Sequence, residues 1–214
     1  MADFNSLVAD VFTITNRSDL VAETQLAVKA ATLQLHKADF FLKDLVETTL
    51  KYDSANYLQQ IPYRTLFPRY RALSYLRKYN PSYNSSPNVL DLQNLYYENG
   101  VGLEFTIISP DQIFDAYNAQ RTNVCYLAGD VINVKSSTAD SYAIMGVYQH
   151  PEVSTAELYK SWIADEAPYA IVYTAAANMF GTTLGNQSKA NANLQLAAIE
   201  FTATKNSNIV TKGF

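Results

Sequence analysis

The chain of 214 residues has only two histidines, His36 and His150, and Ser-His-Asp or Cys-His catalysis would need one of them beside a nucleophile. His36 precedes Asp39 by one helical turn, and such a pair could bind a metal ion. A metal site needs three or four ligands, and the sequence supplies no second cluster. His150 is followed by Pro151 and Glu152, which is typical of a turn between a strand and a helix. The histidines therefore predict neither catalysis nor a bound metal.

Two carboxylates, Asp111 and Asp115, are also one helical turn apart. A general acid/base pair needs that proximity together with burial, which separates the two pKa values. Asp111, however, directly follows Ser109 and Pro110, which together with Gln112 predict the capping box of a short helix. An acidic residue is favourable at such a start without any catalytic role. We therefore interpret Asp111 as a helix-start charge.

The remaining candidates for chemistry are weaker. Cys125 stands between Val124 and Tyr126 in a strand-like segment, where it is expected to be a small buried hydrophobic residue. Gly100-Val101-Gly102 lacks the rest of a dinucleotide-binding fingerprint, and no phosphate-binding loop occurs. We expect a protein that is not an enzyme and that has no catalytic, cofactor-binding or metal-binding residues.

Composition narrows the class of protein further. The formal net charge of −4 excludes a generally basic DNA-coating protein. One cysteine cannot form an internal disulfide, which suits a reducing compartment. The N-terminal sequence has no basic segment typical of a secretory signal, and the longest apolar stretch, 167–180, is shorter than the ~20 residues that cross a bilayer. We expect folding in the cytoplasm.

The order of predicted elements is helices, a β-rich middle, then helices. Helices are predicted at 4–12 and 20–38, with a turn at 13–18 in which Asn16 or Ser18 caps the second helix. A capping box at 154–157 predicts the return to helix, Pro168 restarts a helix that runs to about Phe180, and Gly185-Asn186 ends it. A last helix, 188–204, is predicted to place Leu194, Ala197, Ala198 and Phe201 on one side.

The middle of the chain alternates strand and turn signals. Strands are predicted at 72–79, 103–108 and 142–148, and a hairpin spans 124–134. The segments 52–57 and 80–88 are predicted to be a turn and an exposed loop. The expected fold is α+β: one domain, 1–214, with a helical bundle from 1–44 and 154–204, an inserted antiparallel β-rich subdomain at 45–153, and a C-terminal tail at 205–214.

The predicted helix 20–38 has two apolar series at seven-residue spacing. One contains Val21, Val28 and Leu35, and the other contains Leu26, Leu33 and Phe40. Because the two series point in different directions, the helix must be buried on two sides. It is either a central helix within its own domain or a helix that packs on its own domain by one face and on a neighbouring subunit by the other.

Basic and aromatic residues alternate within 63–79, where no acidic residue occurs. Arginine beside aromatic rings can follow a phosphate backbone and stack on bases, and the same residue types are enriched at protein interfaces. A protein interface, a solvated strand face and a nucleic-acid surface all remain open, although the acidic net charge argues against nucleic acid. The arginines concerned are Arg64, Arg69, Arg71 and Arg77.

The two ends of the chain resemble a known family. Ala167-Pro168 opens an alanine-rich segment that ends at Phe180 and is followed by Leu184-Gly185 and a polar helix; 16–20 reads Asn-Arg-Ser-Asp-Leu before another alanine-rich helix. These patterns are similar to the head-to-tail adaptors of short-tailed bacteriophages, the tail tubular protein A group. The resemblance covers about the first 45 and the last 60 residues, and the middle matches only in its β character.

The resemblance implies a structural virion protein rather than an enzyme. In that family twelve copies form a ring under the portal protein, the tail nozzle docks below, a tail fibre protein is a further possible contact, and DNA passes through the lumen without sequence-specific binding. It implies a subunit interface on the helix 20–38, at Val21, Leu26, Val28, Leu33 and Leu35, and assembly into the virion in the host cytoplasm.

The apolar end of the tail is the expected contact with the portal protein. Ile209, Val210 and Phe214 follow a polar stretch, which could be disordered alone and order on a partner. Deleting 205–214 is then expected to abolish portal binding. The alternative to the adaptor is a nucleic-acid-binding accessory protein that uses the Arg/Tyr-rich segment 63–79.

Overall fold

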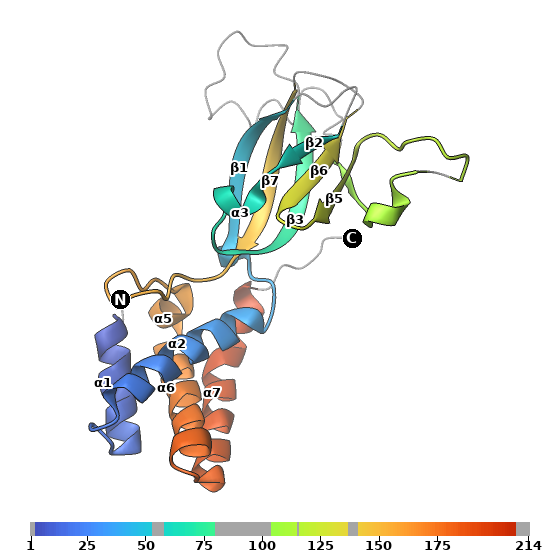
Figure 1. The fold of residues 1–214 in the computed structure, drawn as a ribbon. Helices are drawn as coiled ribbons and strands as arrows, with labels where there is room; N and C mark the ends of the chain where they lie inside the picture. The colour runs from blue at the N-terminus through green and yellow to red at the C-terminus, as the bar shows by residue number, and fades with distance from the viewer. Residues whose placement is uncertain (1–2, 53–57, 80–103, 115, 137–140, 209–214) are drawn as a thin grey trace. The chain divides into compact units, whose positions relative to one another are not determined.

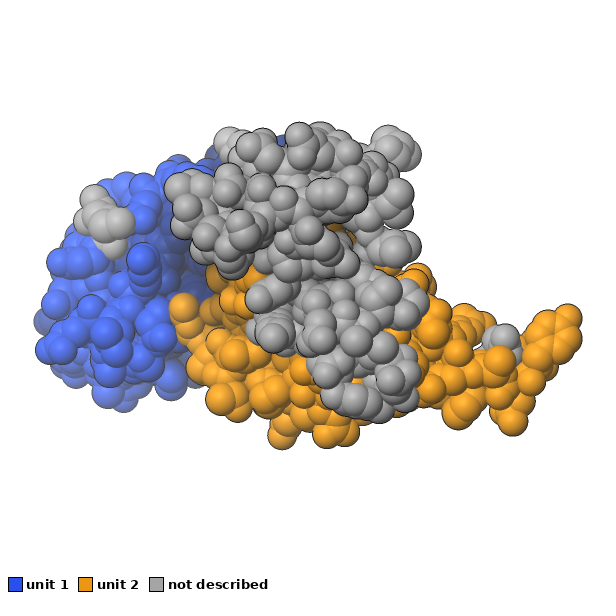
Figure 2. All heavy atoms as spheres, turned by 90° about the horizontal axis from the view of Figure 1, so that it is seen from above, with its two compact units in different colours: residues 1–44, 150–214 blue, residues 45–149 orange. Residues whose placement is uncertain are grey.

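The computed structural model describes residues 3–52, 58–79, 104–114, 116–136 and 141–208 (Figure 1). The chain divides into two compact units, one formed by 1–44 together with 150–214 and the other by 45–149, coloured separately in Figure 2. The first contains the helices of both chain ends and the second contains the sheets, so the α+β fold predicted from the sequence is confirmed.

The helical unit is built around α6 (Pro168–Asn178), which packs against α1, α2, α5 and α7 (Figure 1). Pro168 occupies the start of α6, as predicted, because its fixed φ and missing N–H suit the first helical turn. A π-helical turn, Met179–Thr183, follows, and Gly185 at φ 62° allows the chain to reverse into α7. The remaining helices are α1 (Phe4–Thr15), α2 (Val21–Lys37), η1 (Leu42–Asp44), α5 (Trp162–Glu166) and α7 (Gln187–Asn208).

Two predicted helix starts are wrong. Neither Asn16 nor Ser18 caps α2. Asn16 adopts the left-handed conformation at φ 54° and ends α1, where its N–H donates to the Phe12 carbonyl, and Leu20 precedes α2 without a side-chain cap. Asparagine tolerates that conformation better than most residues. Ser154 begins no helix either, since its N–H donates to Glu152, and the chain stays irregular until Ser161 caps α5.

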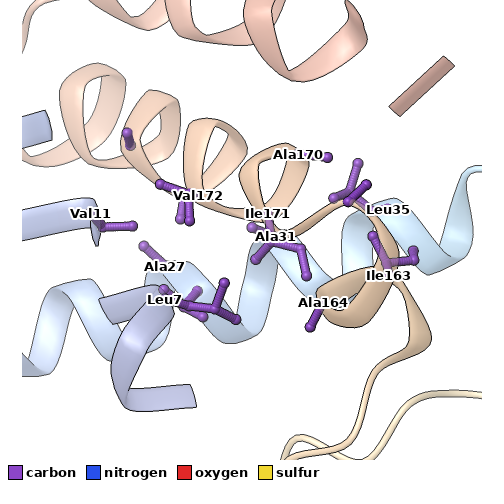
Figure 3. Packing of buried hydrophobic residues seen from close by; sticks show 14 of the residues in the cluster. Leu7, Val11, Ala27, Ala31, Leu35, Ile163, Ala164, Ala170, Ile171 and Val172 are labelled. Atoms are coloured by element: carbon purple, nitrogen blue, oxygen red, sulfur yellow. The ribbon is translucent and has the colours of Figure 1, made fainter. Parts of the chain in front are cut away.

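The core of the helical unit gathers small and branched side chains from four helices (Figure 3). Leu7 and Val11 of α1 meet Ala27 and Ala31 of α2 and the centre of α6. Alanines on α2 and α6 let the helix axes approach closely, because small side chains reduce the distance between packed helices. This explains why alanine-rich segments, rather than leucine-rich ones, form the centre of the unit.

The β unit contains two sheets. The first has the order β1 (Leu45–Tyr52), β7 (Ser141–Gln149), β3 (Tyr70–Tyr79), and all its pairs are antiparallel. The second has the order β2, β6, β5, β4, and its β4–β5 pair is parallel, unlike the antiparallel pairing that the sequence predicts. Its strands are β2 (Gln59–Ile61), β6 (Val131–Lys135), β5 (Val124–Ala128) and β4 (Thr106–Ile107), and α3 (Tyr63–Leu66) and η3 (Pro110–Gln112) complete the unit.

Several predicted local features of the β unit are confirmed. β5 and β6 form the expected hairpin, with Gly129 at φ 61° in its turn. Ser109 and Gln112 form the capping box at η3. The predicted loop 80–88, the glycines at 100–102 and Asp115 lie outside the described residues, as does nearly all of the predicted turn 52–57. Among the described helices, none is long and apolar enough to cross a membrane.

Candidate functional site

One side of α2 belongs to the core of its own unit. Val28 is completely buried and Leu35 is 8% exposed, and the buried Ala27 and Ala31 lie on the same side of the helix. These residues recur at spacings of three and four, which keeps them on one side of an α-helix. Val21 departs from the predicted series with Val28 and Leu35, because it sits at the first position of the helix and is 48% exposed.

The opposite side of α2 is apolar, and the described residues of the chain leave most of it exposed. Leu26 is 68% exposed, Ala30 is exposed and Leu33 is half-buried. We call Leu26, Ala30 and Leu33 the outer stripe of α2. Phe40, the third member of the predicted series, lies beyond the end of the helix and is also exposed. A central helix buried all round within its own domain is therefore wrong for α2.

A second exposed apolar surface lies on α7. Ala190, Asn193, Ala197 and Phe201 are its buried side, whereas Leu194 and Ala198, predicted to share it, are exposed at its edge. The prediction fails because the buried side of the helix includes Asn193, a polar residue that a search for apolar side chains does not count. Away from the buried side, Ala192, Leu196 and Ile199 are exposed, with Ile199 at 71%. We call these three residues the outer stripe of α7.

His36 is held in a buried polar cluster that joins α2, η1 and α5. Its Nδ1 lies 2.8 Å from Oδ1 of Asp44, and its Nε2 lies 2.9 Å from Oγ of Ser161. The indole N–H of Trp162 donates to the same Asp44 oxygen at 2.8 Å. A carboxylate can only accept, so Nδ1 carries a proton, and a neutral ring then accepts the Ser161 hydroxyl proton at Nε2.

This order of Ser161, His36 and Asp44 is the one used by a Ser-His-Asp triad. The serine differs from a nucleophile in two respects: it is only 5% exposed, and its Oγ accepts the backbone N–H of Ala164 as the cap of α5. A catalytic serine must reach the carbonyl carbon of a substrate. The geometry fits a structural brace, in which every polar atom of the cluster has a partner.

Sequence reasoning missed this brace. It paired His36 with Asp39, whereas Asp39 forms an ion pair with Lys205, whose Nζ lies 3.4 Å from the carboxylate. Ser161 could have been recognised as a helix cap, but it lies 125 residues from His36 in sequence. No local spacing signals such a contact.

The Arg/Tyr-rich segment is largely engaged within the β unit. Arg64 forms an ion pair with Asp130, and the Arg77 guanidinium lies 4.3 Å from the ring centroid of Tyr75. Tyr75 in turn fills the space above Gly146, where an added Cβ would come within 2.5 Å of the ring. Arg69 is exposed and Arg71 is half-buried, and each has a contact of its own. Arg77 is thus held within the β unit, whereas Arg64 and Arg69 lie on its surface.

The other candidate residues are placed as follows. Cys125 is completely buried in β5, and burial raises the pKa of its thiol to about 12, so it is protonated at neutral pH. Asp111 lies in the first turn of η3, as expected for a helix-start charge. Ile209, Val210 and Phe214 lie outside the described residues, and α7 extends to Asn208, four residues into the predicted tail. The described residues contain no group of three potential metal ligands.

No family model matches the chain, and no curated protein matches it either.

Proposed function

We propose that the protein is a structural adaptor of a tailed virion, a ring of identical copies between the portal protein and the tail nozzle. The observation that carries the proposal is the uncovered apolar side of α2. A Leu side chain that is 68% exposed in the middle of a regular helix loses the free energy of burial, about 1.5–3 kcal/mol, unless another molecule covers it.

The two outer stripes suit a ring better than a two-fold dimer. A head-to-tail contact joins two different surfaces of the same chain, and repeated contacts of this kind close into a ring when the rotation between copies allows it. The stripes of α2 and α7 are such a pair: different residues, on different helices, of one unit.

The charge of the chain suits a channel for DNA. The net charge of −4 per copy, repeated around a ring, repels phosphates and lets DNA slide through the lumen. Of the arginines in segment 63–79, Arg64 forms a surface ion pair with Asp130 and Arg77 lies against Tyr75. The adaptor would therefore act through contacts with other copies and with its partner proteins.

The proposal is tested by locating the chain in purified phage particles. Gold-labelled antibody against the chain is expected at one capsid vertex, with the chain present in dissociated particles at several copies per portal ring. Its absence from particles would contradict the adaptor. In the same system, deletion of 205–214 is expected to abolish binding to the portal protein, and unchanged binding would show that the tail is not the portal contact.

A further inference from the structure

We infer that the outer stripe of α2 in one copy packs in parallel along the outer stripe of α7 in the next copy, in one specific register. The inference rests on the proposed ring, and it adds the two surfaces and their alignment. The occupant of each stripe is a second copy of this chain.

The two stripes have the same spacing. On α2 the residues are Leu26, Ala30 and Leu33; on α7 they are Ala192, Leu196 and Ile199. Both sets follow i, i+4, i+7, which places three side chains in a row along one side of a helix and is the spacing of a coiled-coil seam. Two rows with equal spacing can stay in contact along two turns.

In parallel alignment the side chains also match in size. Leu26 comes opposite Ala192, Ala30 opposite Leu196, and Leu33 opposite Ile199. Two of these three positions place a large side chain against a small one, which lets packed helices interlock without voids. Leu26 and Ile199, at 68% and 71%, are the most exposed large aliphatic residues of the two helices, and the contact would cover both.

The charges at the helix ends fix the direction. Glu23 lies one turn before Leu26, and Lys189 lies one turn before Ala192, so the parallel register brings opposite charges together. At the other end, Lys37 of α2 comes opposite Ala203 of α7, one turn beyond Glu200. In the antiparallel arrangement that keeps Ala30 opposite Leu196, Lys37 would instead come opposite Lys189, and Glu23 would come opposite Ala203. Like charges at an interface are unfavourable and exclude the wrong pairing.

Pairing α2 with α2 across a two-fold axis would also bring Glu23 near Lys37. It would leave the outer stripe of α7 uncovered and would close the assembly at two copies. The head-to-tail contact covers both stripes with one interface. A test must therefore distinguish contacts between unlike stripes from contacts between like stripes.

Disulfide trapping makes this distinction. Cysteines replace Ala30 and Leu196, which face each other in the register, either singly or in one chain (A30C/L196C). The matched control is A30C/A198C, in which the second cysteine is exposed but lies off the outer stripe of α7. The native Cys125 stays in place, because it is buried and its thiol is protonated under the conditions used. The full chain is oxidised with copper phenanthroline and examined on non-reducing gels.

The double variant is expected to form a ladder of linked dimers, trimers and longer chains, about tenfold or more faster than the control, because cysteines held at a contact react at a high effective concentration. Mixing the two single variants is expected to give dimers only. Abundant dimers from A30C alone would show an α2–α2 contact and overturn the inference, and so would equal ladders, or no ladders, from the double variant and the control.

Failure of this inference and failure of the adaptor are separable. If the chain lies at the capsid vertex but the cysteine pair does not link, the register is wrong and the adaptor stands. If the pair links but the chain is absent from particles, the contact stands and the adaptor is wrong.

Discussion

The helices α2 and α6 are both alanine-rich and apolar on more than one side, but they differ in how much of their surface is buried within the unit. In α6 the residues from Ala170 to Val172 and from Thr174 to Ala177 are all buried, because α1, α2, α5 and α7 surround it. In α2 only one side is buried, and Leu26 on the other side remains exposed. A helix that is apolar on several sides needs several neighbours. Among the described residues, the helical unit provides such neighbours around α6 but not along the outer stripe of α2.

The comparison separates stability from assembly. Side chains of α6 contribute to the free energy of unfolding of the single copy, because their neighbours belong to the same chain. Leu26 and Ala30 on the outer stripe of α2 are exposed in the single copy and therefore add little to its folding stability. Substitutions in the two helices are therefore expected to move different measurements.

The largest expected effect is at the centre of α6. Ile171→Ala removes most of a completely buried side chain and leaves a cavity, so it is expected to lower the free energy of unfolding by about 2–5 kcal/mol. Urea unfolding followed by circular dichroism measures it. Ala30→Ser on α2 is the control, expected within about 0.5 kcal/mol of the parent. A small effect at Ile171 would remove the contrast between the two helices.

The brace around His36 predicts a smaller loss of stability and no catalysis. Ser161→Ala removes a partner of His36 and the cap of α5, and is expected to cost about 1–3 kcal/mol by the same unfolding measurement. In the native protein a fluorophosphonate probe is expected to leave Ser161 unlabelled, because the side chain is buried. Rapid, stoichiometric labelling of Ser161 would instead establish a nucleophile.

Leu26→Gln is expected to leave folding unchanged and to weaken association. The free energy of unfolding should stay within about 0.5 kcal/mol, because the side chain is mostly exposed in one copy. Sedimentation equilibrium over a range of concentrations is expected to show association weakened by about tenfold or more, since a large apolar contact is lost. Gln34→Ala, on the same helix, is the matched control. Unfolding of the variant without any change in association would contradict the assignment.

The charge pair at the start of the stripes gives the smallest effect. Glu23→Lys or Lys189→Glu alone is expected to weaken association by about two- to fivefold, as for exposed ion pairs. Combining the two substitutions in one chain is expected to restore association, because the charges are exchanged across the parallel contact. The loss should shrink at high salt. Additive losses in the combined variant would contradict the pairing of Glu23 with Lys189.

The sequence predicted features that depend on neighbouring residues. Pro168 at the start of α6, Gly185 after it, the capping box of Ser109 and the hairpin at Gly129 all follow from local backbone chemistry. The two apolar series of α2 were visible for the same reason, since a helical repeat is read from spacing alone.

Features that depend on distant contacts were missed. The link between His36 and Ser161 joins residues 125 positions apart. Asn16 was assigned to the wrong helix, because an Asn between two helices can end the first as readily as begin the second. On α7 the buried side includes the polar Asn193, whose side chain donates to the carbonyl of Lys189, so a search for apolar residues places that side incorrectly.

The most direct test of the account is the solvent accessibility of the two outer stripes as copies associate. Hydroxyl-radical footprinting with mass spectrometry, from dilute to concentrated protein and in purified particles, reads Leu26 and Ile199 together, with buried Ile171 as the internal reference. The account predicts that labelling of Leu26 and Ile199 falls in parallel on assembly while that of Ile171 stays low throughout. Undiminished labelling of Leu26 in the assembled state would contradict it.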